Sequence, residues 1–436
     1  MEEVEENIPK INHLSVEITE DNNLLSSIQQ KMESITLSHS ISRVPEQLSK
    51  GNEQSYHPTL VSIGPLHHGK NCLKPMEDQK WRYFNALLGR EANTESTLES
   101  CITSLRHSEQ KARIFYGEKI EKESDQFIEM LLLDGCFIIE LFLEYSIKSL
   151  RRRDDPFFSS NETIFNLICD LILYENQLPF FILEQLFHLV PIPTQSSMSL
   201  IDLSLRFFHK LIRKDHSKFL HHQVLNSKPL HFLDLIRQYY LPTYPESPFK
   251  DRQTKQIKVH PATKIRALGI RIEKAFSESP SDITFLNQKL KIPSLEIHKY
   301  TEIMFRNLIA MELCQPKCSK QVTSYVILME KLIQSQRDAG LLQYKDIVIN
   351  CTEWEIMLLF KKLIVDIDIK DFYYTGICEK IYGFQRRREV CWQNMRDIYH
   401  KSPFGIAGFS LAALFLVFLF TGALLSGFTF LLHHFQ

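Results

Sequence analysis

The sequence lacks a strong charge of either sign. Its 51 Lys and Arg residues nearly balance 52 Asp and Glu residues, which leaves a formal net charge of −1 at pH 7. A chain with this balance produces no field that would concentrate nucleic acid or acidic substrates at its surface. We therefore expect no nucleic-acid partner.

The sequence also lacks the short motifs that identify familiar enzyme classes. It has no Gly-x-Ser-x-Gly nucleophile elbow, no Walker phosphate loop, no dinucleotide-binding fingerprint and no protein-kinase motif set. We therefore predict that the protein is not an enzyme. No catalytic, cofactor-binding or metal-binding residue is assigned from the sequence, and no cofactor is expected.

The sequence also lacks the cysteine spacing of a disulfide framework and the composition of a signal peptide. The nine cysteines are scattered in odd number, without the spacing of a secreted domain, so reduced thiols are expected. Cys314 and Cys318 form the one close pair, and a structural role is favoured because no second pair accompanies them. The first residues have neither a basic nor an apolar leader region, so no signal peptide and a cytosolic body are expected.

What the chain does contain is one long uncharged stretch, residues 403–432, which has no charged side chain. Because a helix needs roughly 20 apolar residues to cross the hydrocarbon core, we predict a single transmembrane helix there, followed by a short tail at 433–436. Basic residues gather before this stretch, which places that side in the cytosol; they are Arg386, Arg387, Arg388, Arg396 and Lys401. The predicted topology is single-pass and tail-anchored, in the plasma membrane or an endomembrane.

The rest of the chain indicates a mainly α-helical fold: a large helical body with a few short strands, plus the C-terminal transmembrane helix. Residues 1–23 are acidic and aperiodic and are expected to be disordered. The helical body is assigned to 24–400. A Pro-containing, charged loop at 242–261 is the expected seam if the body has two subdomains.

Hydrophobic periodicity places the individual elements. Helices are predicted at 24–35, 76–88, 98–116, 125–143, 164–176, 180–189, 200–219, 263–276, 301–314, 324–335, 353–365 and 377–399. Short strands are predicted at 283–286 and 290–295, and residues 60–65 are expected to be a strand or an extended segment. The helix at 125–143 is apolar on nearly all sides, which is typical of a helix buried in a large core.

Two acids interrupt that apolar helix. Asp134 and Glu140 lie six residues apart, about 240° out of phase, so one helix cannot present them as a facing catalytic pair. Buried acids more often pair with arginines, and the expected partners are Arg43, Arg82 and Arg306. The alternative remains open that the protein is an enzyme of unrecognised class that uses the carboxylates of the 129–140 helix.

Two further groups of polar residues can be interpreted either as structural or as chemically functional. His67 and His68, with His57 nearby, could be metal ligands or a base, but no cysteine or carboxylate lies at ligand spacing, so a structural turn is favoured. The run 175–177 precedes Pro179, which cannot continue a helix, and these side chains are expected to satisfy the backbone groups of the broken helix end.

Two surfaces are candidates for binding. The basic side of the 203–219 helix could rest on anionic lipid, although a solvated face is favoured. In the transmembrane stretch, small residues four apart allow close helix approach, so homo-association is possible through Gly422, Ser426, Ala423 and Gly427.

Several of these segments together resemble one family, the plant proteins built on the domain of unknown function DUF247, also called UPF0481. The resemblance covers about residues 40–430 and is carried by 43–45 (Arg-Val-Pro), 61–69 (Val-Ser-Ile-Gly-Pro-Leu-His-His-Gly), Met76 and Glu77 with 80–82 (Lys-Trp-Arg), 129–140, 175–181 and 305–310. Departures from the family pattern are small: Ser42 stands where an aromatic residue is common, and Glu330 where Asp is usual.

The resemblance implies a largely helical, single-pass membrane protein of plants without an assigned reaction. Some grass members of the family are linked to pollen–stigma self-incompatibility. We therefore expect a membrane-tethered, non-enzymatic interaction or signalling protein, with partners that the sequence does not identify.

Overall fold

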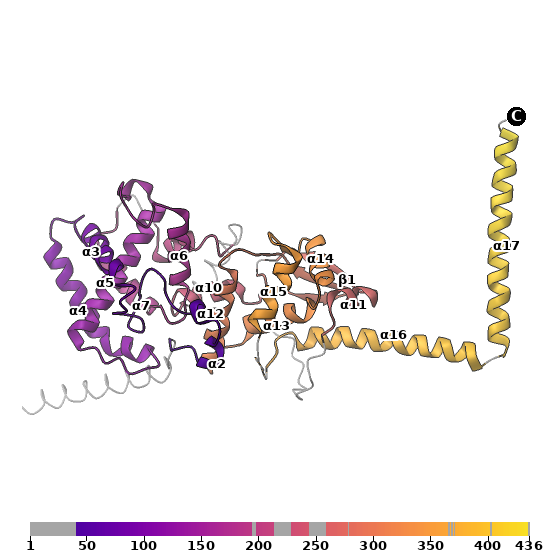
Figure 1. The fold of residues 1–436 in the computed structure, drawn as a ribbon, viewed down its shortest axis with the longest axis horizontal. Coiled ribbons are helices and arrows are strands. Elements are labelled where there is room, and N and C mark those ends of the chain that lie inside the picture. The colour runs from indigo at the N-terminus through magenta and orange to yellow at the C-terminus, as the bar shows by residue number, and fades with distance from the viewer. Residues whose placement is uncertain are drawn as a thin grey trace, which may run out of the picture. The chain divides into compact units, whose positions relative to one another are not determined.

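The computed structural model describes residues 41–434, except 194–197, 213–227, 244–258, 278, 365–366, 368, 370 and 402 (Figure 1). The described residues divide into two compact units. The body comprises 41–243 and 260–374, and the second unit contains the helices from residue 375 onward. The predicted mainly helical fold with a few short strands is confirmed.

Most of the body is α-helical. The first half contains α2 (Glu46–Ser49), α3 (Lys74–Leu88), α4 (Thr94–Phe115), α5 (Ser124–Ser146), α6 (Asn161–Leu171), α7 (Phe180–Leu189), α8 (Leu200–Phe207) and α10 (Phe232–Tyr240), with the 3-10 turns η1 (Glu53–Ser55) and η2 (Lys148–Leu150). The second half contains α11 (Ala262–Ala267), α12 (Thr301–Cys314), α13 (Gln321–Leu332), α14 (Gln336–Tyr344) and α15 (Glu353–Leu363).

Helix α5 is the centre of the first half, as its apolar sequence predicts. It packs against α3, α4, α7 and α8, and Figure 1 shows it among the first three. Almost every side chain from Phe127 to Glu144 is buried. Gly135 permits the approach of α7, because a Cβ atom there would lie 2.3 Å from the Leu186 Cδ1 atom. Phe142 stacks on Phe207 of α8 with ring centroids 4.6 Å apart.

The strands are short and lie in the second half of the body. One sheet has the order β1-β3-β2, from Arg271–Ala275, Lys289–Pro293 and Thr284–Leu286, with β1 parallel and β2 antiparallel to β3. A second, two-stranded parallel sheet pairs β4 (Leu295–Glu296) with β5 (Val348–Ile349). The strands predicted at 283–286 and 290–295 are confirmed, and β5 was not predicted.

Four predicted helices differ from the structure. The 200–219 helix ends at Phe207, and residues 208–212 form turns and a bend. The 263–276 helix ends at Ala267, because Gly269 adopts a φ of 83° and the chain continues as β1. The 164–176 helix ends at Leu171, five residues early, and an irregular loop, 172–179, follows. The 324–335 helix starts at Gln321 and ends at Leu332, where Ser335 caps the unpredicted helix α14.

Several predictions concern residues outside the described part of the chain. They are the disordered 1–23 segment, the 24–35 helix, the end of the 200–219 helix beyond residue 212 and most of the 242–261 seam. Residues 60–65, predicted as a strand or an extended segment, form no strand and bend at residues 60, 64 and 65. Helix α10 was missed by the periodicity argument.

The second unit contains α16 (Thr375–Lys401) and α17 (Pro403–His434). Within α17, the 18 residues Ser410–Gly427 have a mean hydropathy of 2.1, and none of them is buried. By length and composition this helix is long and apolar enough to cross a membrane.

Candidate functional site

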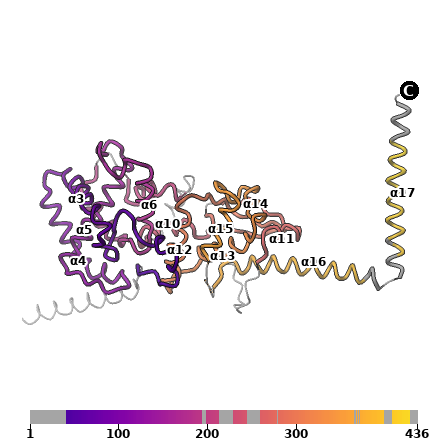
Figure 2. The backbone as a smooth tube through the Cα atoms, viewed as in Figure 1, coloured from indigo at the N-terminus to yellow at the C-terminus, as the bar shows by residue number. Residues whose placement is uncertain are grey.

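Asp134, the histidines and the run 175–177, all singled out in the sequence, meet at an irregular segment, residues 55–69, which we call the strap. Figure 2 shows it as part of the indigo tube that crosses the first half of the body. The strap has no strand partner, so its backbone N–H groups need other acceptors. Buried side chains from α5, from α6 and from the loop 172–179 provide them.

Asp170, at the end of α6, accepts three of these N–H groups. Its Oδ1 atom lies 2.9 Å from the Thr59 nitrogen, and its Oδ2 atom lies 2.6 and 2.9 Å from the Leu60 and Val61 nitrogens. Burial raises the pKa of Asp170 to about 6, although the N–H donors oppose this shift. The carboxylate therefore acts as a clamp for the backbone of the strap.

Asn176 continues the clamp along the strap. Its Oδ1 atom accepts from the Ile63 nitrogen at 2.7 Å, and its Nδ2 atom donates to the Val61 carbonyl at 3.1 Å and the Asp170 carbonyl at 2.9 Å. The neighbouring Gln177 donates from Nε2 to the carbonyls of Leu171 and Leu173. The prediction that the run 175–177 satisfies a broken helix end is confirmed for Asn176 and Gln177 and is wrong for Glu175, which accepts from the Val44 nitrogen instead.

Asp134 of α5 anchors the next residue of the strap and is paired with a lysine. Its Oδ2 atom accepts from the Gly64 nitrogen at 2.8 Å, and its Oδ1 atom lies 2.6 Å from the Lys80 ammonium nitrogen. Lys80 also donates to the Ser62 carbonyl and lies 2.8 Å from a Glu77 carboxylate oxygen. The predicted arginine partner is therefore wrong: the cation comes from α3 and is a lysine.

The two charges of this pair depend on each other. Burial raises the pKa of Asp134, and Lys80 opposes that shift. Burial alone would lower the pKa of Lys80, but Asp134 and Glu77 outweigh it, so the pKa of Lys80 is raised. A Cβ atom at Gly64, where φ is 72°, would lie 2.6 Å from the Gln177 carbonyl oxygen, so only glycine fits beside this pair.

Glu175 ties the strap to the chain segment that precedes it. Its Oε1 atom accepts from the Val44 nitrogen at 2.7 Å, its Oε2 atom lies 3.1 Å from His67 Nε2, and Arg43 lies 3.7 Å away. Burial alone would raise the pKa of Glu175, but His67, the Val44 N–H and Arg43 hold it below its usual value. Burial lowers the pKa of His67.

Of the three histidines, His67 contacts this carboxylate and His57 contacts His67. His57 meets His67 edge to face, with ring centroids 5.5 Å apart. Among the described residues, no group of three His, Cys, Asp or Glu side chains is placed to hold a metal ion. All nine cysteines, Cys314 and Cys318 included, are free thiols.

Glu140 belongs to a second, separate cluster on α5. Its Oε1 atom lies 2.5 Å from an Arg90 guanidinium nitrogen, so the predicted partners Arg43, Arg82 and Arg306 are wrong for this acid too. Glu144, one turn further along α5, is completely buried, and its nearest cation is Arg152 at 3.9 Å. Burial, with the charges of Glu140 and Asp155, raises the pKa of Glu144 to about 8.

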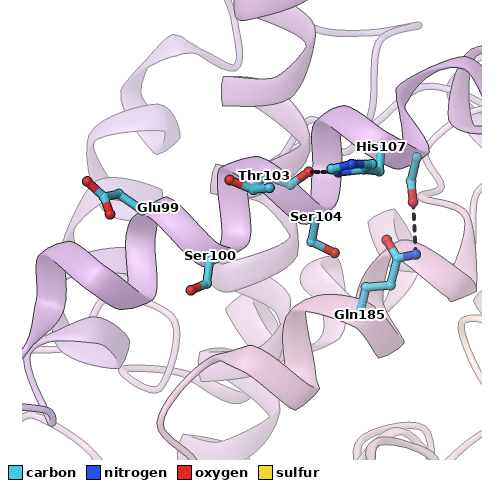
Figure 3. A pocket seen from close by; sticks show the side chains of 7 residues that line it. Glu99, Ser100, Thr103, Ser104, His107 and Gln185 are labelled. Atoms are coloured by element: carbon cyan, nitrogen blue, oxygen red, sulfur yellow. Dashed lines mark hydrogen bonds between the residues drawn. The ribbon is translucent and has the colours of Figure 1, made fainter. Parts of the chain in front are cut away.

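An open hollow with a volume of about 540 Å³ lies between α4 and α7. It is lined by Glu99, Ser100, Thr103, Ser104, His107, Ser108 and Gln185 (Figure 3). The His107 Nδ1 atom lies 2.7 Å from the Thr103 carbonyl, and Gln185 donates to the Ser108 hydroxyl at 2.9 Å. Neither Asp134 nor Glu140 lines it, so the acids of the enzyme alternative do not face this hollow.

Sequence reasoning missed four members of these clusters: Lys80, Arg90, Glu144 and Asp170. A signal existed for Asp170, because it is the only acid in the apolar part of its helix. Arg90 follows the end of α3 at an exposed turn, and nothing in its sequence surroundings connects it to Glu140.

The comparison with known proteins gives one family. The family described as DUF247, plant proteins of unknown function, matches residues 41–419. The UPF0481 protein At3g47200 of Arabidopsis thaliana is 27% identical over 406 residues, which cover 87% of this chain and 84% of the relative. The putative UPF0481 protein At3g02645 of the same plant is 26% identical over 234 residues, which cover 51% of this chain and 41% of the relative. No solved structure matches the chain.

Proposed function

The chain belongs to the DUF247 family of plant proteins of unknown function, and from this premise we propose that it is a membrane-tethered interaction or signalling protein that catalyses no reaction. Its α17 helix anchors it as a single pass, and its body binds protein partners in the cytosol. One feature supports the tether, a second supports the orientation and a third supports the absence of catalysis.

The tether rests on the exposed apolar surface of α17, which is the observation that carries the proposal. Between Leu411 and Leu425 the large side chains are 53% to 75% exposed. A contiguous apolar surface of this length is unfavourable in water and stable in a bilayer, where an α-helix satisfies its own backbone groups. A membrane is the environment that fits the whole circumference of such a helix.

The orientation rests on the charges that precede the helix. Five basic residues lie within about 20 residues of the apolar stretch on its N-terminal side, which is the distance over which such charges set orientation. The helix therefore enters the membrane from the cytosol. The plasma membrane or an endomembrane would place the body in the same compartment.

The absence of catalysis is supported by the use that the fold makes of its polar residues. Asp134, Asp170 and Glu175 each accept at least one backbone N–H of the strap or its neighbours, and the second oxygens of Asp134 and Glu175 face cationic or imidazole side chains. A catalytic acid needs access to a substrate, and these side chains are at least 94% buried. The alternative is an enzyme that uses the carboxylates of the 129–140 helix, and for Asp134 it would require the strap to move off α5.

A fractionation experiment tests the tether. The full chain, expressed in plant cells, should remain in the membrane pellet after alkaline carbonate extraction. A variant with Leu416→Asp, Leu419→Asp and Phe420→Asp should move to the soluble fraction, because each charge at the centre of a helix costs about 3 kcal/mol on insertion. The matched control replaces the same three residues by alanine and should stay in the pellet. Extraction of the unmodified chain by carbonate would refute the tether.

A further inference from the structure

Helix α16 leaves apolar side chains exposed on its approach to α17. Trp392 is 62% exposed and Met395 is 49% exposed. Cys391 is also exposed, and Phe384, two turns earlier, is partly exposed. Exposed apolar side chains of this size beside an apolar helix mark a surface that a partner or a lipid covers.

These side chains lie on one side of the helix. At 3.6 residues per turn, one side of the helix carries Phe384, Arg388, the adjacent Cys391 and Trp392, and Met395, because 384, 388, 391 and 395 are three or four residues apart. Positions 386, 389, 393 and 397, occupied by Arg, Glu, Gln and Asp, lie on the other side. We call the row Phe384, Arg388, Cys391, Trp392 and Met395 the juxtamembrane face of α16.

The charge around this face is positive. Residues 386–401 contain five basic and two acidic side chains, although the whole chain carries a net charge of only −1. An arginine within the apolar row can place its carbon stem along the apolar surface and its guanidinium at the level of phosphate groups. Basic side chains beside tryptophan are the composition of a helix that lies at a membrane–water boundary.

The distance along the chain limits what can cover the face. Trp392 precedes Pro403, the first residue of α17, by 11 residues. At 1.5 Å per residue this is about 17 Å of helix, so Trp392 lies no further than about 17 Å along the chain from the start of α17. If α17 spans the membrane, Trp392 cannot leave the neighbourhood of the lipid surface.

We propose that the juxtamembrane face of α16 lies in the headgroup layer of an anionic leaflet, with Trp392 and Met395 at the acyl boundary and Arg387 and Arg388 bound to lipid phosphates. This inference rests on the proposed tether. A second copy of the chain fits the face less well, because two such faces would bring like charges together, whereas an anionic lipid surface complements them.

The test uses the full chain with one tryptophan. Trp81→Phe and Trp354→Phe, at exposed positions, leave Trp392 as the sole indole. The protein is reconstituted into phosphatidylcholine vesicles that contain phosphatidylserine and lipids brominated near the top of the acyl chain. Trp392 emission should shift to shorter wavelength and be quenched. The matched control carries Trp392→Phe and Gln393→Trp, which moves the indole to the polar side, and its emission should remain unshifted and mostly unquenched.

Carbonate extraction and the dependence of the emission on protein density distinguish the ways in which the proposal could fail. Carbonate extraction of the same vesicles reports insertion of α17 independently. Inserted protein in which both indoles are quenched equally, or in which neither is, would overturn the interfacial face and leave the tether intact. Protein that is not inserted would overturn both. A wavelength shift that grows with protein density and lacks quenching would assign the face to a second copy and overturn the lipid inference.

The lipid charge provides the last arm of the test. Arg387→Gln with Arg388→Gln should lose the part of the quenching that phosphatidylserine adds over pure phosphatidylcholine. The control Glu389→Gln, on the other side of the helix, should retain that difference. An unchanged phosphatidylserine effect in the arginine variant would overturn the role of these two residues in binding phosphate.

Discussion

The ammonium nitrogen of Lys80 lies 2.6 Å from the Asp134 carboxylate, and the exposed fractions of the two side chains are 0% and 1%. The pair joins α3 to α5, and both partners also bind the strap, Lys80 through the Ser62 carbonyl and Asp134 through the Gly64 N–H. One ion pair thus connects the strap and the neighbouring helix α3 to α5, in which Asp134 lies 54 residues after Lys80. Because loss of either partner leaves the other charge buried and unpaired, a substitution at one of them should destabilise the fold.

We expect the body to fold without α17. A chain of residues 40–396 should be soluble and give a helical circular dichroism spectrum, because the large apolar side chains of the described body are mostly buried, whereas those of α17 are not. The measurement is expression followed by size-exclusion chromatography and circular dichroism. Insolubility in every host, with membrane association retained, would show that the body or the included part of α16 exposes an apolar surface large enough to prevent solubility.

Replacing Lys80 by methionine should destabilise this body strongly. Removal of one partner from a buried ion pair leaves an uncompensated charge and costs about 3–5 kcal/mol. The free energy of unfolding from urea titration measures the effect. The matched control is Lys74→Met, an exposed position on the same helix, which should change stability by less than about 0.5 kcal/mol. Equal stability of the two variants would show that the Lys80–Asp134 pair contributes little.

The elements that could be predicted from the sequence are those whose periodicity agrees with their packing. Helix α5 is apolar around its circumference and is surrounded by helices, so its position and its burial were both predictable. The 164–176 helix failed because apolar residues continue past Leu171 while the chain turns. The turn depends on hydrogen bonds from Gln177 and Asn176, which periodicity does not register.

The candidate site was predictable only in part, for the same physical reason. Asp134 and Glu140 were recognised as buried acids, since charges in an apolar helix must be compensated. Their partners Lys80 and Arg90 lie 54 and 50 residues earlier in the chain, and no local pattern determines which cation approaches which acid. Such pairings depend on how α3 packs on α5, which is a property of the tertiary structure.

Glu144 should make the stability of the body depend on pH. Burial and the charges of Glu140 and Asp155 raise its pKa from a usual value of about 4.5 to about 8 in the folded state. A carboxyl group with a raised pKa favours folding fully below its unfolded pKa, and this contribution is lost as the pH rises from there to the folded pKa. The melting temperature should therefore fall between about pH 5 and pH 8.

The variant Glu144→Gln should reduce that fall, because its side chain stays neutral throughout the range. Thermal unfolding of the variant and of the unmodified body at several pH values gives the comparison. Glu129→Gln, at an exposed position of α5, serves as the control and should keep the original slope. An unchanged slope in Glu144→Gln would show that Glu144 is charged in the folded body at neutral pH.

The orientation of the body can be measured with its own glycosylation sequons. Asn161 and Asn350 begin the sequences Asn-Glu-Thr and Asn-Cys-Thr, and both residues are exposed, so a lumenal or extracellular body would present them to the glycosylation machinery. If the basic residues before α17 keep the body in the cytosol, neither is modified. A sequon added after Gln436 on a polar spacer should be glycosylated instead, and a gel shift with and without glycosidase reports each site. Replacement of each asparagine by glutamine is the control that assigns any shift. A glycan on Asn161 or Asn350 with the added sequon bare would invert the orientation, and the partners of the body would then be outside the cytosol.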